Sequence, residues 1–457
     1  MSLTKLSVLG YRGFSKKQSM KFAKPTGQAG SGLTIITGTN NSGKSSVIEC
    51  LRARTGYQNI SFTVGKRNQS VDEVIIEYEI NEKTETVKSL ANGSSETQKI
   101  GVDQNFSIFV LPSRRAFEPY FHKSERGRDD YLNAHPLPPQ RGSTLPEFAS
   151  RLFKIVKDPS EFNRILEKAL GYAPNWSIDQ SDQGQHFLKF TNGGHTHSSD
   201  GLGEGIVSVF AIVDALYDSA PGSVVVIDEP ELSLHPALQR RVSALLLEYA
   251  KDRQIIISTH SPYFVTLEAL AEGAHIVRAT NESLYGTLIH ELSSTAKQKI
   301  KSLVKGNINN PHIFGLDARE IFFQEDGIIL TEGQDDVLLY PEVAAQIGAL
   351  MPAHFFGWGI GGASNMSTIA TVLNDLGFKK VAGLLDKDKE GEIPALKSLF
   401  PEYFFATIPA KDIRTKKARD ATPAVDGLLD EKRRIRPEYA DQTKELFDSL
   451  GKFMKPS

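Results

Sequence analysis

Apolar residues gather in short, strand-sized runs over the first hundred residues. Residues 4–10 and 33–37 are typical of strands, and the second run leads directly into a glycine-rich turn before a helical pattern at residues 44–54. Between residues 60 and 110, short segments such as residues 74–80 alternate apolar and polar positions. That alternation, bounded by polar turns, predicts an antiparallel sheet.

The middle of the chain changes to helical spacing and then to bare apolar runs. A helical insertion is expected at about residues 115–200, because residues 146–170 repeat apolar positions at helical intervals around a Pro-Ser break. A turn rich in histidine and glycine is expected at residues 191–205. Helices and buried strands then alternate, which predicts a parallel sheet: helix 205–217, strand 224–227, helix 237–249 and strand 255–258.

A polar stretch at residues 295–318 is typical of a linker, and a second series of strands and helices runs from Ile328 to about Ile408. We therefore expect an α/β protein with two domains, residues 1–315 and 316–457.

Composition narrows the possible classes of protein. The 457 residues contain 53 Lys and Arg against 55 Asp and Glu, which excludes a uniformly basic nucleic-acid-binding protein but permits a local basic groove. The single cysteine, Cys50, fits a reducing cytoplasm. The start of the chain lacks the long apolar stretch of a secretory signal, and no apolar run approaches the roughly 20 residues that span a bilayer. We expect a cytoplasmic protein with no membrane segment.

The glycine-rich turn fits the phosphate-binding pattern G-x-x-x-x-G-K-[ST], and it lies between a strand and a helix as that pattern requires. Its backbone N–H groups and the helix N-terminus would face the phosphates of ATP. Lys44 would reach the β- and γ-phosphates, and Ser45 would hold Mg²⁺. The alternative is a chance polar turn. The predicted nucleotide-binding residues here are Gly38, Asn40, Asn41, Ser42, Gly43, Lys44, Ser45 and Ser46.

Two carboxylates, Asp228 and Glu229, follow the apolar run at residues 224–227. They stand at the carboxyl end of a strand, where ligands bind in open α/β sheets. Asp228 would act on Mg²⁺ directly or through its hydration shell, and Glu229 would be the base that polarises the attacking water. The alternative is an ordinary acidic loop.

The segment after these acids, and a histidine just past the next strand, resemble the ATP-binding-cassette ATPases of the SMC and RecF type. That resemblance implies that His260 reads the γ-phosphate. The stretch from Ser199 to Gly205 resembles the cassette signature, in which Ser199 and Gly201 would contact ATP held by the opposite subunit. The protein would then be at least a dimer. The alternative for this stretch is a Ser/Gly turn that caps a helix.

A second group of acids follows two later strands. Glu332 ends the strand that starts at Ile328, Asp336 lies one helical turn further, and residues 381–385 lead into Asp386 and Asp388. Two carboxylates about 4 Å apart repel by roughly 4 kcal/mol, and Mg²⁺ or Mn²⁺ relieves such repulsion. The predicted metal ligands are Glu332, Asp336, Asp386, Asp388 and Glu392, with Ser45 and Asp228 in the ATPase site. Two separate helix-capping turns are the alternative.

This second pattern, with Gly361 and Gly362 between its halves, resembles a TOPRIM domain, whose acids cut or join phosphodiester bonds. The resemblance assigns catalytic roles to Glu332, Asp386 and Asp388. The segment around Lys411 resembles the lysine-bearing part of OLD-family nucleases, where the lysine would stabilise charge on the scissile phosphate; a surface lysine is equally compatible. Basic residues at 411–419 and 432–436 suit either a nucleic-acid backbone or a solvated helix face.

An SMC- or ABC-like P-loop ATPase domain followed by a C-terminal TOPRIM domain is the architecture of the OLD (overcoming lysogenization defect) family. The resemblance implies an ATP-dependent, Mg²⁺-dependent DNA endonuclease in anti-phage defence, with a homodimeric ATPase. The compact length is similar to that of members that serve retrons, for which a reverse transcriptase and structured RNA would be partners. The alternative is an ATP-driven DNA-repair or sensor scaffold whose TOPRIM-like domain binds nucleic acid or a partner without cutting.

Overall fold

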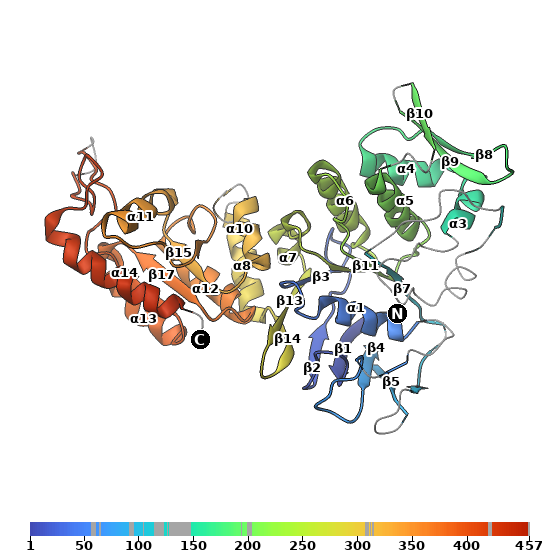
Figure 1. The fold of residues 1–457 in the computed structure, drawn as a ribbon, viewed down its shortest axis with the longest axis horizontal. Coiled ribbons are helices and arrows are strands. Elements are labelled where there is room, and N and C mark those ends of the chain that lie inside the picture. The colour runs from blue at the N-terminus through green and yellow to red at the C-terminus, as the bar shows by residue number, and fades with distance from the viewer. Residues whose placement is uncertain are drawn as a thin grey trace. The chain divides into compact units, whose positions relative to one another are not determined.

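A computed structural model describes residues 1–55, 61–63, 65–90, 96–103, 105–113, 123–125, 127, 148–192, 194–198, 203–306, 310, 312, 315–418 and 423–455. The chain divides into two compact units (Figure 1). The first contains residues 1–265 and 269–291, and the second contains residues 266–268 and 292–457. The predicted boundary near residue 315 therefore falls inside the second unit.

The first unit is built on a six-stranded sheet in the order β14-β13-β3-β12-β11-β7, in which all strands but β14 run parallel. The predicted alternation of helices and parallel strands is confirmed. The strands and the helices that lie between them in sequence are β3 (Leu33–Thr37), α1 (Lys44–Ala53), β7 (Ile108–Leu111), α5 (Glu204–Tyr217), β11 (Val224–Asp228), α6 (Pro236–Tyr249), β12 (Gln254–Ser258), α7 (Leu267–Ala271), β13 (His275–Glu282) and β14 (Gly286–Glu291).

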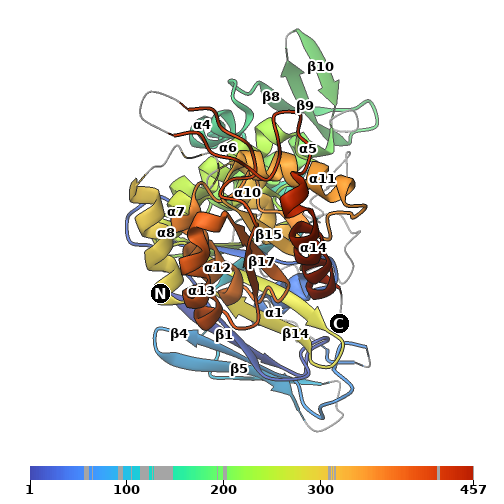
Figure 2. The same ribbon diagram turned by 90° about the vertical axis from the view of Figure 1, so that its left-hand side faces the viewer.

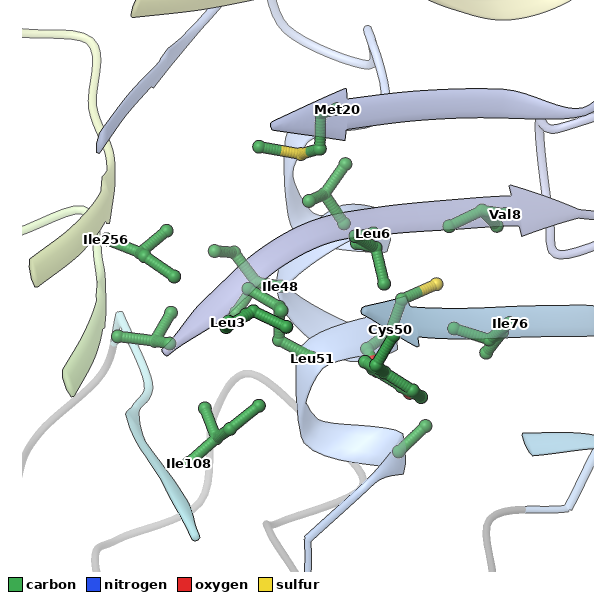
Figure 3. Packing of buried hydrophobic residues seen from close by; sticks show 14 of the residues in the cluster. Leu3, Leu6, Val8, Met20, Ile48, Cys50, Leu51, Ile76, Ile108 and Ile256 are labelled. Carbon is green, nitrogen blue, oxygen red and sulfur yellow. The ribbon is translucent and has the colours of Figure 1, made fainter. Parts of the chain in front are cut away.

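A second, antiparallel sheet packs on α1 from the other side, in the order β2-β1-β4-β5-β6. Its strands are β1 (Leu3–Leu9), β2 (Gln18–Lys21), β4 (Ile75–Ile80), β5 (Lys83–Ser89) and β6 (Thr97–Ile100). The antiparallel prediction for residues 60–110 is therefore correct for β4 to β6 and wrong for β7. Figure 3 shows Leu51 and Cys50 of α1 among Leu6 and Ile76 of this sheet. Burial of these apolar side chains fixes the helix that follows the glycine-rich turn.

The insertion combines two helices with a small sheet. Helices α3 (Phe148–Ile155) and α4 (Ser160–Leu170) have the predicted helical spacing. The residues after them form a three-stranded antiparallel sheet, β10-β9-β8, in place of a simple turn: β8 (Trp176–Gln180), β9 (His186–Asn192) and β10 (His195–Ser198). A buried ion pair from Arg151 of α3 to Asp214 of α5, 3.0 Å long, attaches the insertion to the core of the first unit.

The second unit is a parallel four-stranded sheet in the order β16-β15-β17-β18. Helix α12 covers one face, while α11 and α14 cover the other (Figure 2). The elements are α8 (Ser294–Gly306), α10 (Leu316–Glu320), β15 (Ile328–Thr331), α11 (Gln334–Gln346), β16 (His354–Phe355), α12 (Met366–Asp375), β17 (Val381–Leu385), α13 (Ile393–Leu399), β18 (Phe404–Thr407) and α14 (Ala440–Met454).

The linker predicted at residues 295–318 is wrong, because most of its described part is helical. Ala296 and Ile300 of α8 are buried, and Lys299 donates hydrogen bonds to Ser367 and Thr371 of α12. These contacts place α8 in the second unit. Across the described part of the chain, no helix is long and apolar enough to cross a membrane.

Candidate nucleotide site and candidate acidic site

The glycine-rich turn connects β3 to α1, as its sequence pattern requires. Gly38 and Gly43 adopt φ of 135° and 108°, a region that side chains disfavour. A Cβ on Gly38 would stand 2.2 Å from the Ala279 carbonyl oxygen, and one on Gly43 would stand 2.6 Å from a methyl of Thr287. Strand β13 and the start of β14 therefore crowd the turn, and both positions require glycine.

Lys44 begins α1 with a buried side chain that folds back over the turn. Its Nζ donates to the carbonyl oxygens of Gly38 and Thr39 at 2.8 and 2.9 Å. Ser45 is half-buried beside it, Ser46 is buried, and Asn40 and Asn41 are exposed. The Ser42 hydroxyl is buried without a hydrogen-bond partner. The predicted phosphate-binding residues thus form one continuous loop around the lysine amine.

Asp228 stands at the carboxyl end of β11, on the same sheet edge as the turn. Strand β12 lies between β3 and β11, so its last residue, Ser258, separates the two. The Ser258 hydroxyl donates to a carboxylate oxygen of the buried Asp228. Glu229 follows with φ of 47° and donates its N–H to the Ser258 carbonyl at 2.9 Å. This turn of the backbone directs the chain away from the strand immediately after Asp228.

His260 lies two residues past β12, and its imidazole is exposed. Its main-chain N–H donates to Oε1 of Glu231 at 2.6 Å, and the Thr259 hydroxyl donates to Oε2 of the same carboxylate at 2.8 Å. Burial raises the pKa of Glu231. The carboxylate therefore joins the loop after β11 to the loop after β12. The sequence pattern predicted no role for Glu231, although it lies only three residues after Asp228.

The signature-like residues Ser199 and Gly201 lie outside the described residues. The described end of that stretch contacts the loop after Asp228. A Cβ on Gly205 would stand 2.6 Å from the Ser233 carbonyl, and the Ser233 hydroxyl donates to Glu204 at 2.9 Å. The N-terminus of α5 is therefore fixed against the loop that carries the candidate base.

The second acidic group forms where two neighbouring parallel strands end. Glu332 follows β15 and Asp386 follows β17, which pair directly. The Asp386 main-chain N–H donates to Oε1 of Glu332 at 2.9 Å, and Asp336 of α11 accepts the Gly333 N–H at 2.9 Å. The strand-end placement and the one-turn spacing thus bring three of the five predicted acids into one neighbourhood.

Burial and mutual repulsion raise the pKa of the acids in this group. Burial, followed by the charges of Asp336 and Glu332, raises the pKa of Asp386 to about 8. Burial raises the pKa of Asp336 to about 6 and also raises that of Glu332, with the charges of neighbouring acids adding to each. Carboxylates that keep protons near neutral pH are ones whose negative charge lacks compensation, which a divalent cation supplies.

A buried aspartate, Asp412, belongs to the same group and was not predicted. Its charge contributes to the raised pKa of both Asp336 and Asp386, and its carboxylate accepts hydrogen bonds from Lys416 and from the Arg414 N–H. The available signal was its position directly after Lys411, close behind β18. Lys411 itself is exposed.

The remaining predicted ligands lie at the rim. Asp388 and Glu392 are exposed, and both contribute negative charge at Glu332; Asp388 pairs with Lys389 at 2.9 Å. Within the ranges the structure describes, no three His, Cys, Asp or Glu side chains already converge on a metal position. Carboxylate oxygens are the ligands that Mg²⁺ and Mn²⁺ prefer. In this structure Glu332 and Asp336 accept backbone N–H groups, and Asp388 pairs with Lys389.

Five of the eight described basic residues at 411–419 and 432–436 pair with acids. Ion pairs join Arg414 to Asp335, Lys416 to Asp412, Lys417 to Glu431, Arg433 to Glu342 and Arg436 to Asp426. A nucleic-acid backbone would have to compete with these carboxylates.

Parts of the chain are similar to known proteins. Residues 81–266 match a family model described as "AAA domain, putative AbiEii toxin, Type IV TA system". The Old nuclease of Escherichia phage P2 is 25% identical over 161 residues, which cover 34% of this chain and 26% of that protein. The OLD nuclease of Thermus scotoductus is 33% identical over 126 residues, 26% of this chain and 23% of that protein.

Parts of the chain are thus similar in sequence to OLD nucleases. Each match spans about a quarter of the length of the OLD relative. With the sheet order and the phosphate-binding turn, the ATPase-domain match supports a P-loop ATPase fold for the first unit. SMC head domains of Thermotoga maritima and Pyrococcus furiosus cover 64% and 66% of the chain and 100% and 99% of their own lengths. Their identities are 16% and 13% and their TM-scores 0.38 and 0.43.

Proposed function

We propose that the chain is an ATP-hydrolysing, divalent-metal-dependent DNA endonuclease of the OLD type that acts in cytoplasmic anti-phage defence. The ATPase half is supported by three neighbouring strands, β3, β12 and β11, that end in the phosphate-binding turn, His260 and Asp228. Groups at one edge of a parallel sheet can act on one ligand.

In the proposed hydrolysis, Lys44 exchanges its two carbonyl contacts for the β- and γ-phosphates of ATP. Ser45 and Asp228 would hold Mg²⁺. Glu229 takes the proton of the attacking water, and the exposed His260 imidazole binds the γ-phosphate. Glu231 positions His260 through the main chain.

The nuclease half is carried by one observation, the hydrogen-bonded pairing of Glu332 and Asp386 at the ends of adjacent parallel strands. Glu332, Asp336, Asp386, Asp388 and Glu392 would hold Mg²⁺ or Mn²⁺. A bound ion of this kind activates water and stabilises the leaving oxygen. The fold of this chain would bring the carboxylates together, and Lys411 would contact the scissile phosphate. The TOPRIM assignment of the second unit belongs to this proposal.

We further propose that the nucleotide state controls cleavage and that ATP joins two chains into a homodimer. The support is the stretch from Ser199 to Gly205, whose end contacts the loop after Asp228. A reverse transcriptase with structured RNA is the partner that a retron setting would supply.

One observation favours a second candidate, an ATP-driven scaffold that binds nucleic acid without cutting. Asp388 pairs with Lys389 and Asp412 with Lys416, so lysines already compensate two of the acids at this site. A nuclease assay separates the two candidates, using DNA and RNA substrates with Mg²⁺ or Mn²⁺. The endonuclease proposal expects cleavage by the wild type and none by Asp386→Ala, with Asp448→Ala, an exposed acid of α14, as the matched control. Absence of cleavage on every substrate would support the scaffold.

A further inference from the structure

A loop beside the acidic group presents an aromatic ring to solvent. Residues 356–362 run along the end of β15, and their N–H groups continue the strand pairing. Phe356 donates to the Ile329 carbonyl at 2.9 Å, Ile360 to Thr331 at 2.9 Å, and Gly362 to Glu332 at 2.8 Å. Phe356 and Ile360 are buried. The loop is therefore anchored on both sides of Trp358.

The loop touches the backbone next to Glu332. A Cβ on Gly359, which has φ of 86°, would stand 2.7 Å from the Gly333 Cα. Such an approach requires glycine. Because Trp358 directly precedes Gly359, its position is fixed relative to the first carboxylate of the acidic group.

Trp358 is restrained without being buried. Its indole Nε1 donates to Asp317 of α10 at 2.6 Å, and its carbonyl oxygen accepts from Nδ1 of His312 at 2.8 Å. The side chain nevertheless remains 43% exposed. An exposed apolar side chain by itself is common. Here the hydrogen bonds orient a large ring whose surface stays in water.

We propose that Trp358 is a stacking platform for an unpaired base of the nucleic acid at the acidic site. This inference rests on the proposed nuclease function and deepens it by naming the substrate form. A strand held beside these acids gains from an attraction that does not depend on charge, whether or not a cation is bound. Stacking on an aromatic ring supplies it for any base. A ring that is already oriented loses little freedom on binding.

Paired bases inside a duplex are stacked on one another and cannot offer a face to the ring. The site therefore favours single-stranded nucleic acid, or strand ends that have opened, over closed duplex. Sequence preference should be weak, because every base has an aromatic face.

The test is a fluorescence titration of the full-length protein with a single-stranded oligonucleotide and with a hairpin duplex, both with Ca²⁺ in place of Mg²⁺. The chain has two tryptophans, Trp176 and Trp358, so the difference between wild type and Trp358→Phe isolates the signal of Trp358. Anisotropy of a labelled oligonucleotide measures affinity independently, and circular dichroism checks the fold of each variant.

We expect the single strand to quench Trp358. Trp358→Ala should weaken single-strand binding by about 5- to 150-fold, the range of aromatic–base stacking, while Trp358→Phe stays within about threefold of wild type. Hairpin binding should change much less. Equal single-strand affinity of wild type and folded Trp358→Ala overturns the inference and leaves the nuclease proposal standing. Failure of the wild type to bind or cut any nucleic acid overturns both.

Discussion

Replacing Asp386 by asparagine should make the metal-free protein more stable while abolishing cleavage. The folded protein raises the pKa of Asp386 from 3.8 to about 8. A change of one in pKa corresponds to about 1.4 kcal/mol, so the whole displacement sets an upper bound of about 6 kcal/mol. Neighbouring acids share the repulsion and water reaches part of the side chain, so we expect about a third of it, roughly 2 kcal/mol. The bond from the Asp386 N–H to Glu332 survives the substitution.

The stability difference between Asp386→Asn and the wild type should depend on pH. In the unfolded chain Asp386 loses its proton near pH 4, whereas in the folded chain it keeps the proton up to about pH 8. The raised pKa therefore contributes stability below pH 4 that is lost as the pH rises toward 8. Asparagine does not titrate. The stability gap between Asp386→Asn and wild type should thus be small at pH 5 and largest at pH 8.

Scanning calorimetry in EDTA measures this gap. A gain of about 2 kcal/mol should raise the melting temperature of the affected transition by roughly 4–8 °C at pH 8. Asp448→Asn, at an exposed position of α14, is the matched control and should change it little. An Asp386→Asn variant that melts at or below the wild-type temperature at pH 8, or whose advantage is equal at pH 5 and pH 8, would refute the reasoning.

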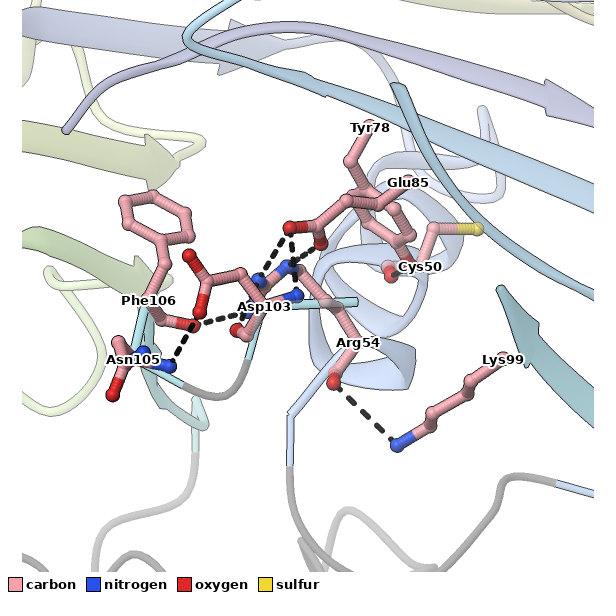
Figure 4. Close-up of polar contacts among 8 residues, drawn as sticks. All are labelled: Cys50, Arg54, Tyr78, Glu85, Lys99, Asp103, Asn105 and Phe106. Carbon is pink, nitrogen blue, oxygen red and sulfur yellow. Dashed lines mark hydrogen bonds and ion pairs between the residues drawn. The ribbon is translucent and has the colours of Figure 1, made fainter. Parts of the chain in front are cut away.

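Other substitutions test the first unit. Lys44→Ala should abolish ATP binding, measured by calorimetric titration, and should change the nucleotide response of cleavage; an unchanged response refutes the coupling. Glu231→Gln should lower kcat for ATP hydrolysis about tenfold with little change in KM, because the amide loses one of the two acceptor positions; a changed KM alone would contradict a positioning role. Glu85→Gln should destabilise by about 3–5 kcal/mol, since it leaves the guanidinium of Arg54 buried and uncompensated (Figure 4). Glu161→Gln, in an exposed pair, should cost less than about 0.5 kcal/mol, and urea titration measures the free energy of unfolding of both variants.

Local pattern predicted the elements that carry the chemistry. The strands that end at residues 37, 228 and 258 are fully buried apolar runs, and a turn or an acid follows each. Such patterns involve only neighbouring residues, so they can be recognised without knowing the fold. The same holds for β15 and β17 before Glu332 and Asp386.

Long-range pairing could not be predicted from pattern alone. Residues 108–111 were grouped with the preceding antiparallel strands, yet β7 pairs with β11, more than a hundred residues later. The polar and Gly-Asn-Asn-Pro content of residues 295–318 predicts a linker, yet the structure forms helix α8 there, with Ala296 and Ile300 buried. Asp412 and Trp358 gain their significance from neighbours distant in sequence, which no local pattern reveals.

The contacts of Lys44 have a consequence for how quickly a nucleotide is captured. Because the amine holds the carbonyls of Gly38 and Thr39, the turn is braced by its own side chain. An arriving phosphate has to displace the contacts of the buried Lys44 amine, and no segment has to fold first. Capture should therefore proceed at the rate of an ordinary encounter, and release of product should return the turn to this self-braced state without any unfolding of α1.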